Sequence, residues 1–192
     1  MSPIPEFQAH IGYPFTLLPD GVYPCEETAF HAHFVNPFGK SQTHQAIRDG
    51  FFRLREEAVE RGIVATQWVD GSFVEGKLNP GEVDVVSFCD YDFLNNLDTQ
   101  GQQFVVEYLN GREATKATYR THTFLVVSCS VGHPYHAVFE TARLYWRNWF
   151  GKTRDVPNPP GPDLPGRPKG FVQMTLGEAN LTPIVAMERG VP

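Results

Sequence analysis

The part of the chain that decides the fold is residues 68–86, WVDGSFVEGKLNPGEVDVV. An apolar strand runs into Gly71-Ser72, and after nine further residues the acid–apolar–acid unit Glu82-Val83-Asp84 enters a second strand. Side chains alternate between the two faces of a strand, so Glu82 and Asp84 are expected side by side on one face, with the valines on the other. The stretch therefore predicts a β-hairpin that presents two neighbouring carboxylates opposite a glycine–serine corner.

Two carboxylates this close repel each other, and such a pair is usually tolerated because a divalent cation or a proton lies between them. Oxygen-only ligands suit Mg²⁺ or Mn²⁺. Gly71 lets the backbone approach a ligand closely, and Ser72 offers a hydroxyl and an N–H to phosphate oxygens. The hairpin thus predicts a phosphoryl-handling site, with the metal ion on Glu82 and Asp84 and a triphosphate on Ser72. The alternative is an exposed acidic sheet face beside an ordinary turn.

The regions around the hairpin predict one domain that mixes helices and strands. Apolar residues at positions 47, 51, 54 and 58 form one stripe of an amphipathic helix, which Ser41 or Thr43 would cap and Gly62 would end. Further strands are expected over residues 63–69, 81–88, 121–129 and 171–176, and further helices near residues 25–34, 90–110 and 134–150. Helices and strands alternate, which predicts an α+β domain around one sheet.

The chain is expected to have three parts. Residues 1–40 are rich in proline, glycine and aromatic residues and predict an irregular N-terminal arm, apart from its one short helix. Residues 41–178 would form the folded domain, and residues 179–192 a C-terminal tail. Within the domain, residues 152–169 are too rich in proline and glycine for regular structure and are expected to form a loop.

Composition restricts the class of protein. The 192 residues fit a single domain, and the net charge of −6 does not imply long-range attraction to nucleic acid. No apolar run approaches the roughly 20 residues that a membrane-spanning helix needs, and the first residues do not read as a secretory signal. The three cysteines, Cys25, Cys89 and Cys129, form no CxxC pair. They are expected to be buried thiols in a cytoplasmic protein that does not contact membranes.

The hairpin resembles the signature of the nucleotidyltransferase superfamily, which is Gly-Ser, a spacer and Asp-apolar-Asp. The resemblance implies a small mixed sheet with helices packed on one face, a nucleoside triphosphate as substrate, and Mg²⁺ or Mn²⁺ as cofactor. Most of the chain also resembles a narrower bacterial and phage family of unknown function. The stretches that carry this second resemblance are Pro5-Glu6-Phe7, Leu18 to Tyr23, Phe38 to Ser41, Trp68 to Val74, Lys77 to Val86, Tyr145-Trp146, Phe150-Gly151 and Pro168 to Gly170.

Two positions depart from the superfamily pattern. The first metal carboxylate is usually Asp, and here it is Glu82. Active members take a third carboxylate from a later strand, where this chain has His122. A neutral imidazole is a poor Mg²⁺ ligand, but it can bind Mn²⁺ or Zn²⁺ or act as a base. Asp90 and Asp92 are alternative sources of the missing carboxylate.

Basic residues outside the hairpin strands are further candidates for phosphate binding. Arg154, Arg167 and Lys169 lie in or beside the loop of residues 152–169, and they could reach a nucleotide as part of a mobile lid. Lys77 lies between the two hairpin strands and could contact the triphosphate. The alternative for all of them is solvated surface charge. Trp146 and Trp149, three residues apart in a predicted helix, are expected in the core.

These features favour an enzyme that transfers a nucleoside monophosphate from a triphosphate to an acceptor, with Glu82, Asp84 and His122 as catalytic residues. The acceptor would be a protein hydroxyl, an RNA end or a small molecule. By analogy with small members of the superfamily, the setting would be a toxin–antitoxin or phage-defence pair, with a partner protein or a second copy of the chain. His122 favours an alternative, a regulatory protein that binds a nucleotide or a partner without catalysis. A third possibility is a structural or phage-associated protein that binds no nucleotide.

Overall fold

The computed structural model describes residues 4–155, 157 and 161–177, which contain one five-stranded mixed sheet in the order β1-β5-β2-β3-β4. The antiparallel pairs are β2–β3 and β2–β5, and the parallel pairs are β1–β5 and β3–β4. The strands are β1 (Gly21–Pro24), β2 (Ala65–Asp70), β3 (Val83–Asp90), β4 (Thr121–Ser128) and β5 (Gly170–Leu176). The predicted hairpin is therefore β2 and β3, and it lies in the middle of the sheet.

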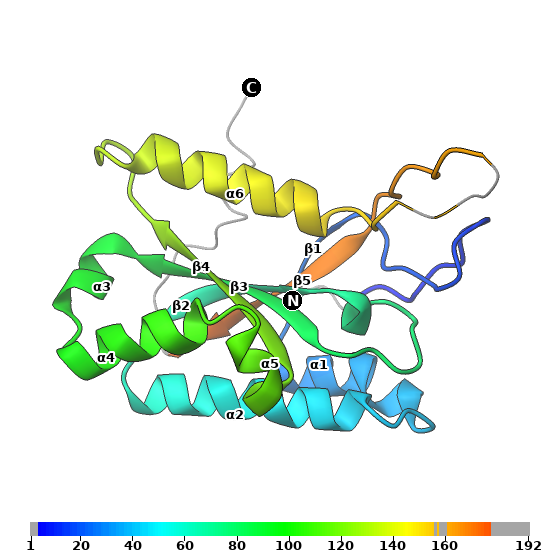
Figure 1. Ribbon diagram of the computed structural model, residues 1–192, viewed down its shortest axis with the longest axis horizontal. Coiled ribbons are helices and arrows are strands. Elements are labelled where there is room, and N and C mark those ends of the chain that lie inside the picture. Colours follow the sequence, from blue (N-terminus) through cyan, green and yellow to red (C-terminus); the bar gives the residue numbers. More distant parts are fainter. Residues whose placement is uncertain (1–3, 156, 158–160, 178–192) are drawn as a thin grey trace.

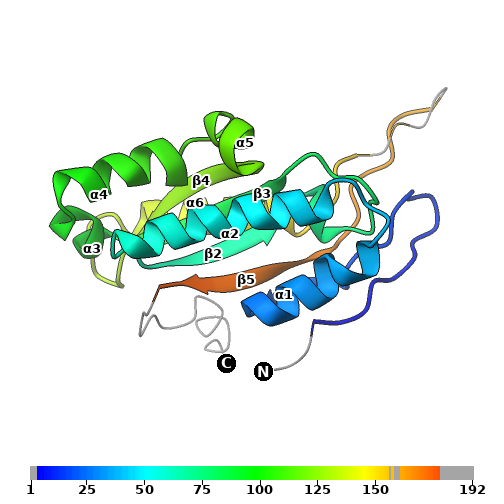
Figure 2. The same cartoon turned by 90° about the horizontal axis from the view of Figure 1, so that it is seen from below.

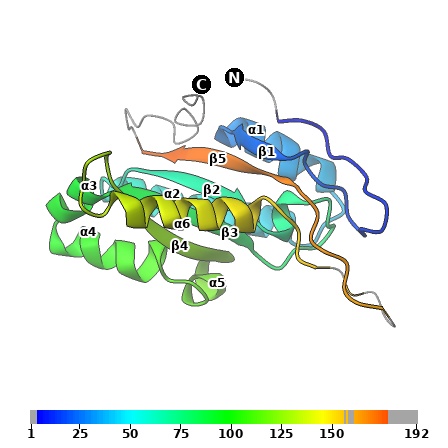
Figure 3. The same cartoon turned by 90° about the horizontal axis from the view of Figure 1, so that it is seen from above.

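Helices cover both faces of the sheet. In Figure 1, α6 lies above the sheet, α1, α2, α4 and α5 lie below it, and α3 lies at its left-hand end. Figure 2, seen from below, shows α2 running along the sheet, and Figure 3 shows α6 crossing the opposite face. The helices are α1 (Glu27–Phe34), α2 (His44–Glu60), α3 (Tyr91–Asn96), α4 (Thr99–Phe104), α5 (Ala114–Tyr119) and α6 (His136–Phe150).

The predicted packing of helices on one face only is wrong, because the central strands are apolar on both sides. All six residues of β2 are buried. Trp68 and Phe171 pack with Phe139 and Phe150 around α6, whereas Val69 belongs to the cluster formed with α1 and α2. A strand with two apolar faces needs cover on each side.

The amphipathic helix predicted around residues 47–58 is confirmed as α2. Its apolar stripe, including Ile47 and Phe51, is fully buried. Ser41 caps the start, because its hydroxyl oxygen accepts from the backbone N–H groups of Thr43 at 3.0 Å and His44 at 3.1 Å. Gly62, in a left-handed conformation (φ +70°), follows the end of the helix, as predicted.

Three regions differ from the sequence-based expectation. The short helix predicted near residues 25–34 is confirmed as α1, but the rest of the predicted arm is not all irregular, because it contributes the edge strand β1. The helix predicted over residues 90–110 is divided into α3, α4 and a π-helical turn (Val105–Leu109). The break comes at Asp98, whose carboxylate accepts from Gly101 N and starts α4. α5 lies in a segment where no element was predicted.

The remaining expectations concern burial. Trp146 packs on Phe124, with ring centroids 4.4 Å apart, but Trp149 is 51% exposed, so its predicted place in the core is wrong. Trp149 stacks on Tyr145 along the outer side of α6 instead. The three cysteines are buried and free, as predicted. Among the described residues, no helix has the length and apolar character of a membrane span. The predicted tail, residues 179–192, lies outside the described part of the chain.

Candidate functional site

The Gly71-Ser72 corner forms where β2 ends. Gly71 has a left-handed conformation (φ +87°), and a short 3-10 turn (Ser72–Val74) follows it. A methyl group at Gly71 would collide with Oδ2 of Asp84, so a residue with a side chain does not fit here. The corner and the second carboxylate of the motif are therefore in direct contact.

Three neighbouring strands place a row of polar residues across the sheet. Asp70 lies opposite Asp84 in the β2–β3 register, and Asp84 lies opposite His122 in the β3–β4 register. Each is two residues from a member of the α6-side cluster, so the row is on the α6 face of the sheet. The row begins where that apolar cover ends, and it brings His122 beside Asp84.

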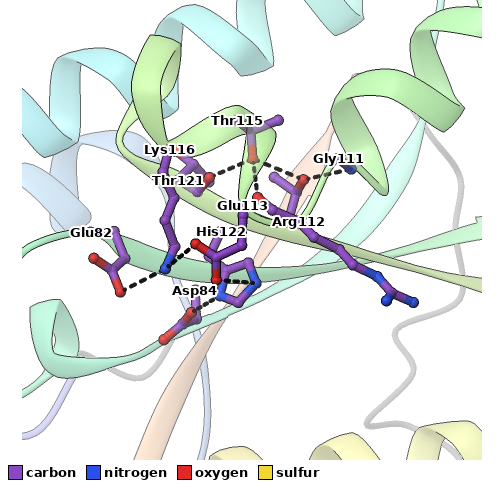
Figure 4. Close-up of polar contacts among 10 residues, drawn as sticks. Glu82, Asp84, Gly111, Arg112, Glu113, Thr115, Lys116, Thr121 and His122 are labelled. Atoms are coloured by element: carbon purple, nitrogen blue, oxygen red, sulfur yellow. Dashed lines mark hydrogen bonds and ion pairs between the residues drawn. The ribbon is translucent and has the colours of Figure 1, made fainter.

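Asp84 and His122 of this row belong to a chain of alternating acidic and basic groups (Figure 4). His122 Nδ1 lies 3.1 Å from Asp84 Oδ1, and His122 Nε2 lies 3.7 Å from Glu113 Oε1. Lys116 Nζ lies 3.0 Å from Glu113 Oε2 and 3.3 Å from Glu82 Oε1. We call Glu82, Lys116, Glu113, His122 and Asp84 the ionic chain. Glu82 and Asp84 are thus the two ends of the ionic chain, and Lys116 is paired with Glu82.

α5 holds the two members of the ionic chain that the sequence analysis missed, Glu113 and Lys116. Thr115 anchors α5 to β4, because its hydroxyl donates to the backbone carbonyl of Thr121 at 2.6 Å. Arg112 and Arg120, on either side of α5, have left-handed conformations (φ +47° and +51°), which cost energy in residues with a side chain. The available signal was the Glu113-x-x-Lys116 spacing, which places opposite charges one helical turn apart.

The environment of Asp84 is partly desolvated. Burial raises the pKa of this carboxyl, and the neighbouring Glu82 raises it further, whereas His122 and Lys116 lower it. The carboxyl is thus held in a place where added positive charge stabilises its ionised form. A bound cation would have this effect.

The donor set fits a divalent cation only in part. Glu82 and Asp84 supply carboxylate oxygens and His122 a ring nitrogen, which suits Mn²⁺ and, through the oxygens, Mg²⁺. Within the described ranges, however, no three histidine, cysteine or carboxylate side chains already converge on one metal position. Because Lys116 contacts Glu82, a cation held by both carboxylates of the motif requires Lys116 to move away.

A second, buried group of charges lies at the other end of the row. Lys169 Nζ lies 2.6 Å from Asp70 Oδ1 and 3.1 Å from Glu75 Oε1, and the hydroxyl of Tyr13 donates to Glu75 Oε2 at 2.9 Å. We call these four residues the buried lysine cluster. Burial raises the pKa of Asp70 to about 7, although Lys169 opposes the rise. Lys169 was expected in a mobile loop that binds nucleotide, but its ammonium is enclosed by two carboxylates.

The other predicted residues lie around the corner or away from it. Ser72 is partly exposed next to Gly71. Lys77 is partly exposed in the hairpin connection, with its ammonium 6.0 Å from the ring centroid of Phe15, and Arg154 is exposed.

Asp90 does not replace the third carboxylate. It caps α3 by accepting from Phe93 N at 3.0 Å. It also lies at the far end of β3, six residues or about 20 Å from Asp84. Asp92 lies still further along the chain, in the first turn of α3, so the prediction that either residue completes the site is wrong.

A hollow of about 470 Å³ lies between the end of α6 and the starts of β1 and β5. Its lining includes Asp20, Arg147, Lys152 and Phe171. Strands β5 and β2 separate it from β3, which carries Asp84. The hollow is therefore not part of the site formed by the corner and the ionic chain.

Comparison with known proteins gives a family match without an assigned activity. The model of a family of unknown function, DUF6932, matches residues 12–175. No curated protein and no solved structure matches the chain. The match covers the corner, the ionic chain and the buried lysine cluster.

Proposed function

The chain belongs to the family of unknown function DUF6932, and we propose that it is a metal-dependent, nucleotidyltransferase-like protein. It would transfer a nucleoside monophosphate from a nucleoside triphosphate to an acceptor. The observation that carries the proposal is the direct contact between Gly71 and the Asp84 carboxylate on a central hairpin. This contact supports the proposal, because a phosphate bound at the corner and a cation bound by Asp84 would then lie next to each other on rigid elements.

Each residue of the motif has a part in this proposal. Glu82 and Asp84 hold Mg²⁺ or Mn²⁺, which would supply charge neutralisation at the α-phosphate. Ser72, partly exposed beside the corner, donates its hydroxyl to a phosphate oxygen. Lys77 and Arg154 stay predicted contacts of the triphosphate, because both are accessible to solvent.

His122 takes the role of a base in place of the third carboxylate. Asp84 accepts from Nδ1 at 3.1 Å, which orients the ring and leaves Nε2 as the nitrogen that can receive a proton. An acceptor hydroxyl within hydrogen-bond distance of Nε2 would lose its proton as it attacks phosphorus. Glu113, 3.7 Å from Nε2, then stabilises the charged ring.

Lys116 is the counter-ion that the metal ion must replace. Its ammonium neutralises Glu82 and Glu113 in the absence of ligand. Exposed lysine–carboxylate pairs are weak, so a divalent cation can displace the side chain at little cost. The freed ammonium is then available to the triphosphate.

A second candidate is a regulatory protein that binds a nucleotide or a partner protein without turnover. The observation that favours it is His122 at the place of a third metal carboxylate, beside Asp84 in the sheet. The acceptor in the first candidate would be a protein hydroxyl, an RNA end or a small molecule. A toxin–antitoxin or phage-defence setting, with a partner protein or a second copy of the chain, follows by analogy with the superfamily.

Incubation with each α-labelled nucleoside triphosphate, in Mg²⁺ or Mn²⁺, tests the enzyme. We expect pyrophosphate release that falls by at least about 100-fold in Asp84→Asn and Glu82→Gln. Glu60→Gln, at the exposed end of α2, is the matched control and should keep the wild-type rate. Nucleotide binding without turnover in either metal would support the regulatory candidate. No calorimetric signal with any of the four common triphosphates would contradict the enzyme and the nucleotide-binding form of the regulatory candidate, and of the two candidates would leave only a regulatory protein that binds a partner protein.

A further inference from the structure

The two carboxylates that bind Lys169 are the residues on either side of the glycine–serine corner. Asp70 directly precedes Gly71, and Glu75 directly follows the 3-10 turn (Ser72–Val74). Lys169 Nζ contacts Asp70 at 2.6 Å and Glu75 at 3.1 Å. One ammonium group therefore contacts the residues on both sides of the segment 71–74 and holds its two ends together.

We propose that Lys169 is a positioning residue, which holds the corner of Gly71 and Ser72 in the conformation that places Gly71 against the Asp84 carboxylate. Its importance for nucleotide binding rests on the function proposed above. Its effect on the conformation of the segment does not depend on that function and can be measured separately.

Burial makes this contact strong and specific. The side chains of Lys169, Asp70 and Glu75 are only 3%, 6% and 8% exposed. Water cannot replace the ammonium at such depth, so its loss would leave both carboxylates without a counter-ion. The second oxygen of Glu75 accepts from the hydroxyl of Tyr13, which completes the cluster.

The core restrains the second half of the segment, because Phe73 and Val74 are fully buried and Phe73 stacks on Phe30. The first half, Gly71 and Ser72, is only partly buried and has fewer restraints. Gly71 has no side chain and so has more conformational freedom than any other residue type. The turn contains one backbone hydrogen bond, from Val74 N to Gly71 O at 3.1 Å. Gly76 N donates to Thr16 O at 2.8 Å, which fixes the chain just beyond the segment. Without Lys169, Gly71 and Ser72 would be free to change conformation, and Gly71 would no longer be held against Asp84.

The same burial argues against direct phosphate binding by Lys169. To reach a ligand, the ammonium would have to leave both Asp70 and Glu75, and two buried carboxylates would lose their counter-ion. Lys169 thus acts on the corner through its neighbours.

Hydrogen exchange tests the proposal in the full-length protein. In Lys169→Met, which keeps the length of the side chain and removes the charge, we expect amide exchange of residues 72–76 to rise about tenfold relative to that of β3. Phe139→Ala, which leaves a cavity under α6, is the control for general destabilisation and should not raise exchange at residues 72–76 selectively. Should Lys169→Met not fold, the triple variant Lys169→Met/Asp70→Asn/Glu75→Gln removes all three charges together and should show the same local increase.

Nucleotide affinity provides the functional readout. We expect Lys169→Met, or the triple variant, to bind the Mn²⁺ complex of a triphosphate about tenfold more weakly. The affinity for Mn²⁺ alone should not change, because Glu82 and Asp84 are untouched. Unchanged exchange at residues 72–76 in both variants would overturn the positioning role. If the wild-type protein binds no nucleotide, the proposed function fails, whereas the exchange result still decides the role of Lys169.

Discussion

Two lysines of this protein each bind two carboxylates, one in the interior and one near the surface. Lys169 contacts Asp70 and Glu75 at 2.6 and 3.1 Å, and its side chain is 3% exposed. Lys116 contacts Glu113 and Glu82 at 3.0 and 3.3 Å, and its side chain is 28% exposed. The chemical groups and the distances are nearly the same, so solvent access is the main difference between them.

This difference separates a fixed ion pair from an exchangeable one. In the interior, removal of one partner leaves charges that nothing else can neutralise. Near the surface, water and salt replace the lost partner, and a lysine held in one ion pair loses side-chain conformational entropy. Lys169 is therefore suited to hold a conformation, and Lys116 to give way to a ligand.

The largest expected effect is the loss of stability in Lys169→Met. Because two buried carboxylates lose their counter-ion, we expect the free energy of unfolding to fall by about 3–5 kcal/mol. Urea denaturation measures this difference. Lys152→Met, an exposed lysine in the loop before β5, is the matched control and should change stability by less than about 0.5 kcal/mol. A loss below about 1 kcal/mol for Lys169→Met would remove the distinction between the two lysines.

The loss of stability in Lys169→Met should depend on pH. Burial raises the pKa of Asp70 to about 7 even with Lys169 present, and without Lys169 the pKa would be higher still. The unfolded state, with a pKa near 3.9, has already released the proton of Asp70 at pH 5.5. Folded wild type and folded Lys169→Met both hold it below about pH 7, whereas above about pH 7 only the variant still does, so the variant alone goes on losing stability there. Stability supplied by this proton is lost as the pH rises. We therefore expect the deficit of Lys169→Met to be about 1–2 kcal/mol smaller at pH 5.5 than at pH 8. A deficit that grows on acidification would contradict the raised pKa.

The smallest effect on stability is expected for Lys116→Met, below about 1 kcal/mol. The affinity of Lys116→Met for Mn²⁺ should rise about fivefold, since the Lys116 ammonium no longer competes with the ion for Glu82. Calorimetric titration at 0.1 M salt measures the change, and Lys116→Arg, which keeps the charge, should bind like the wild type. Raising the salt to 1 M should reduce the difference in Mn²⁺ affinity between Lys116→Met and the wild type. An unchanged Mn²⁺ affinity in Lys116→Met would show that Lys116 does not compete for the carboxylates.

The part of the site that could be predicted is the part that is local in sequence. Alternation along a strand predicts Glu82 and Asp84 on one face, and both belong to the ionic chain in the structure. Glycine at position 71 predicts a close approach to a ligand, and the close approach that the structure shows is to Asp84. The resemblance puts His122 at the position of the third carboxylate, in the strand expected over residues 121–129, and the structure has His122 opposite Asp84. Glu113 and Lys116 could not be placed, since α5 is only six residues long and has no apolar period of its own.

The sequence by itself determined which residues share a face, because the periods of strands and helices are properties of the local backbone. The α2 stripe and the β2–β3 hairpin follow from those periods. Tertiary structure alone decided which charges are buried, which lysine pairs with which carboxylates, and that both faces of the sheet are covered. Lys169 and Asp70 are 99 residues apart, and only packing of distant segments removes water from between them. Solvent access, the property that distinguishes Lys169 from Lys116, therefore exists only in the folded chain.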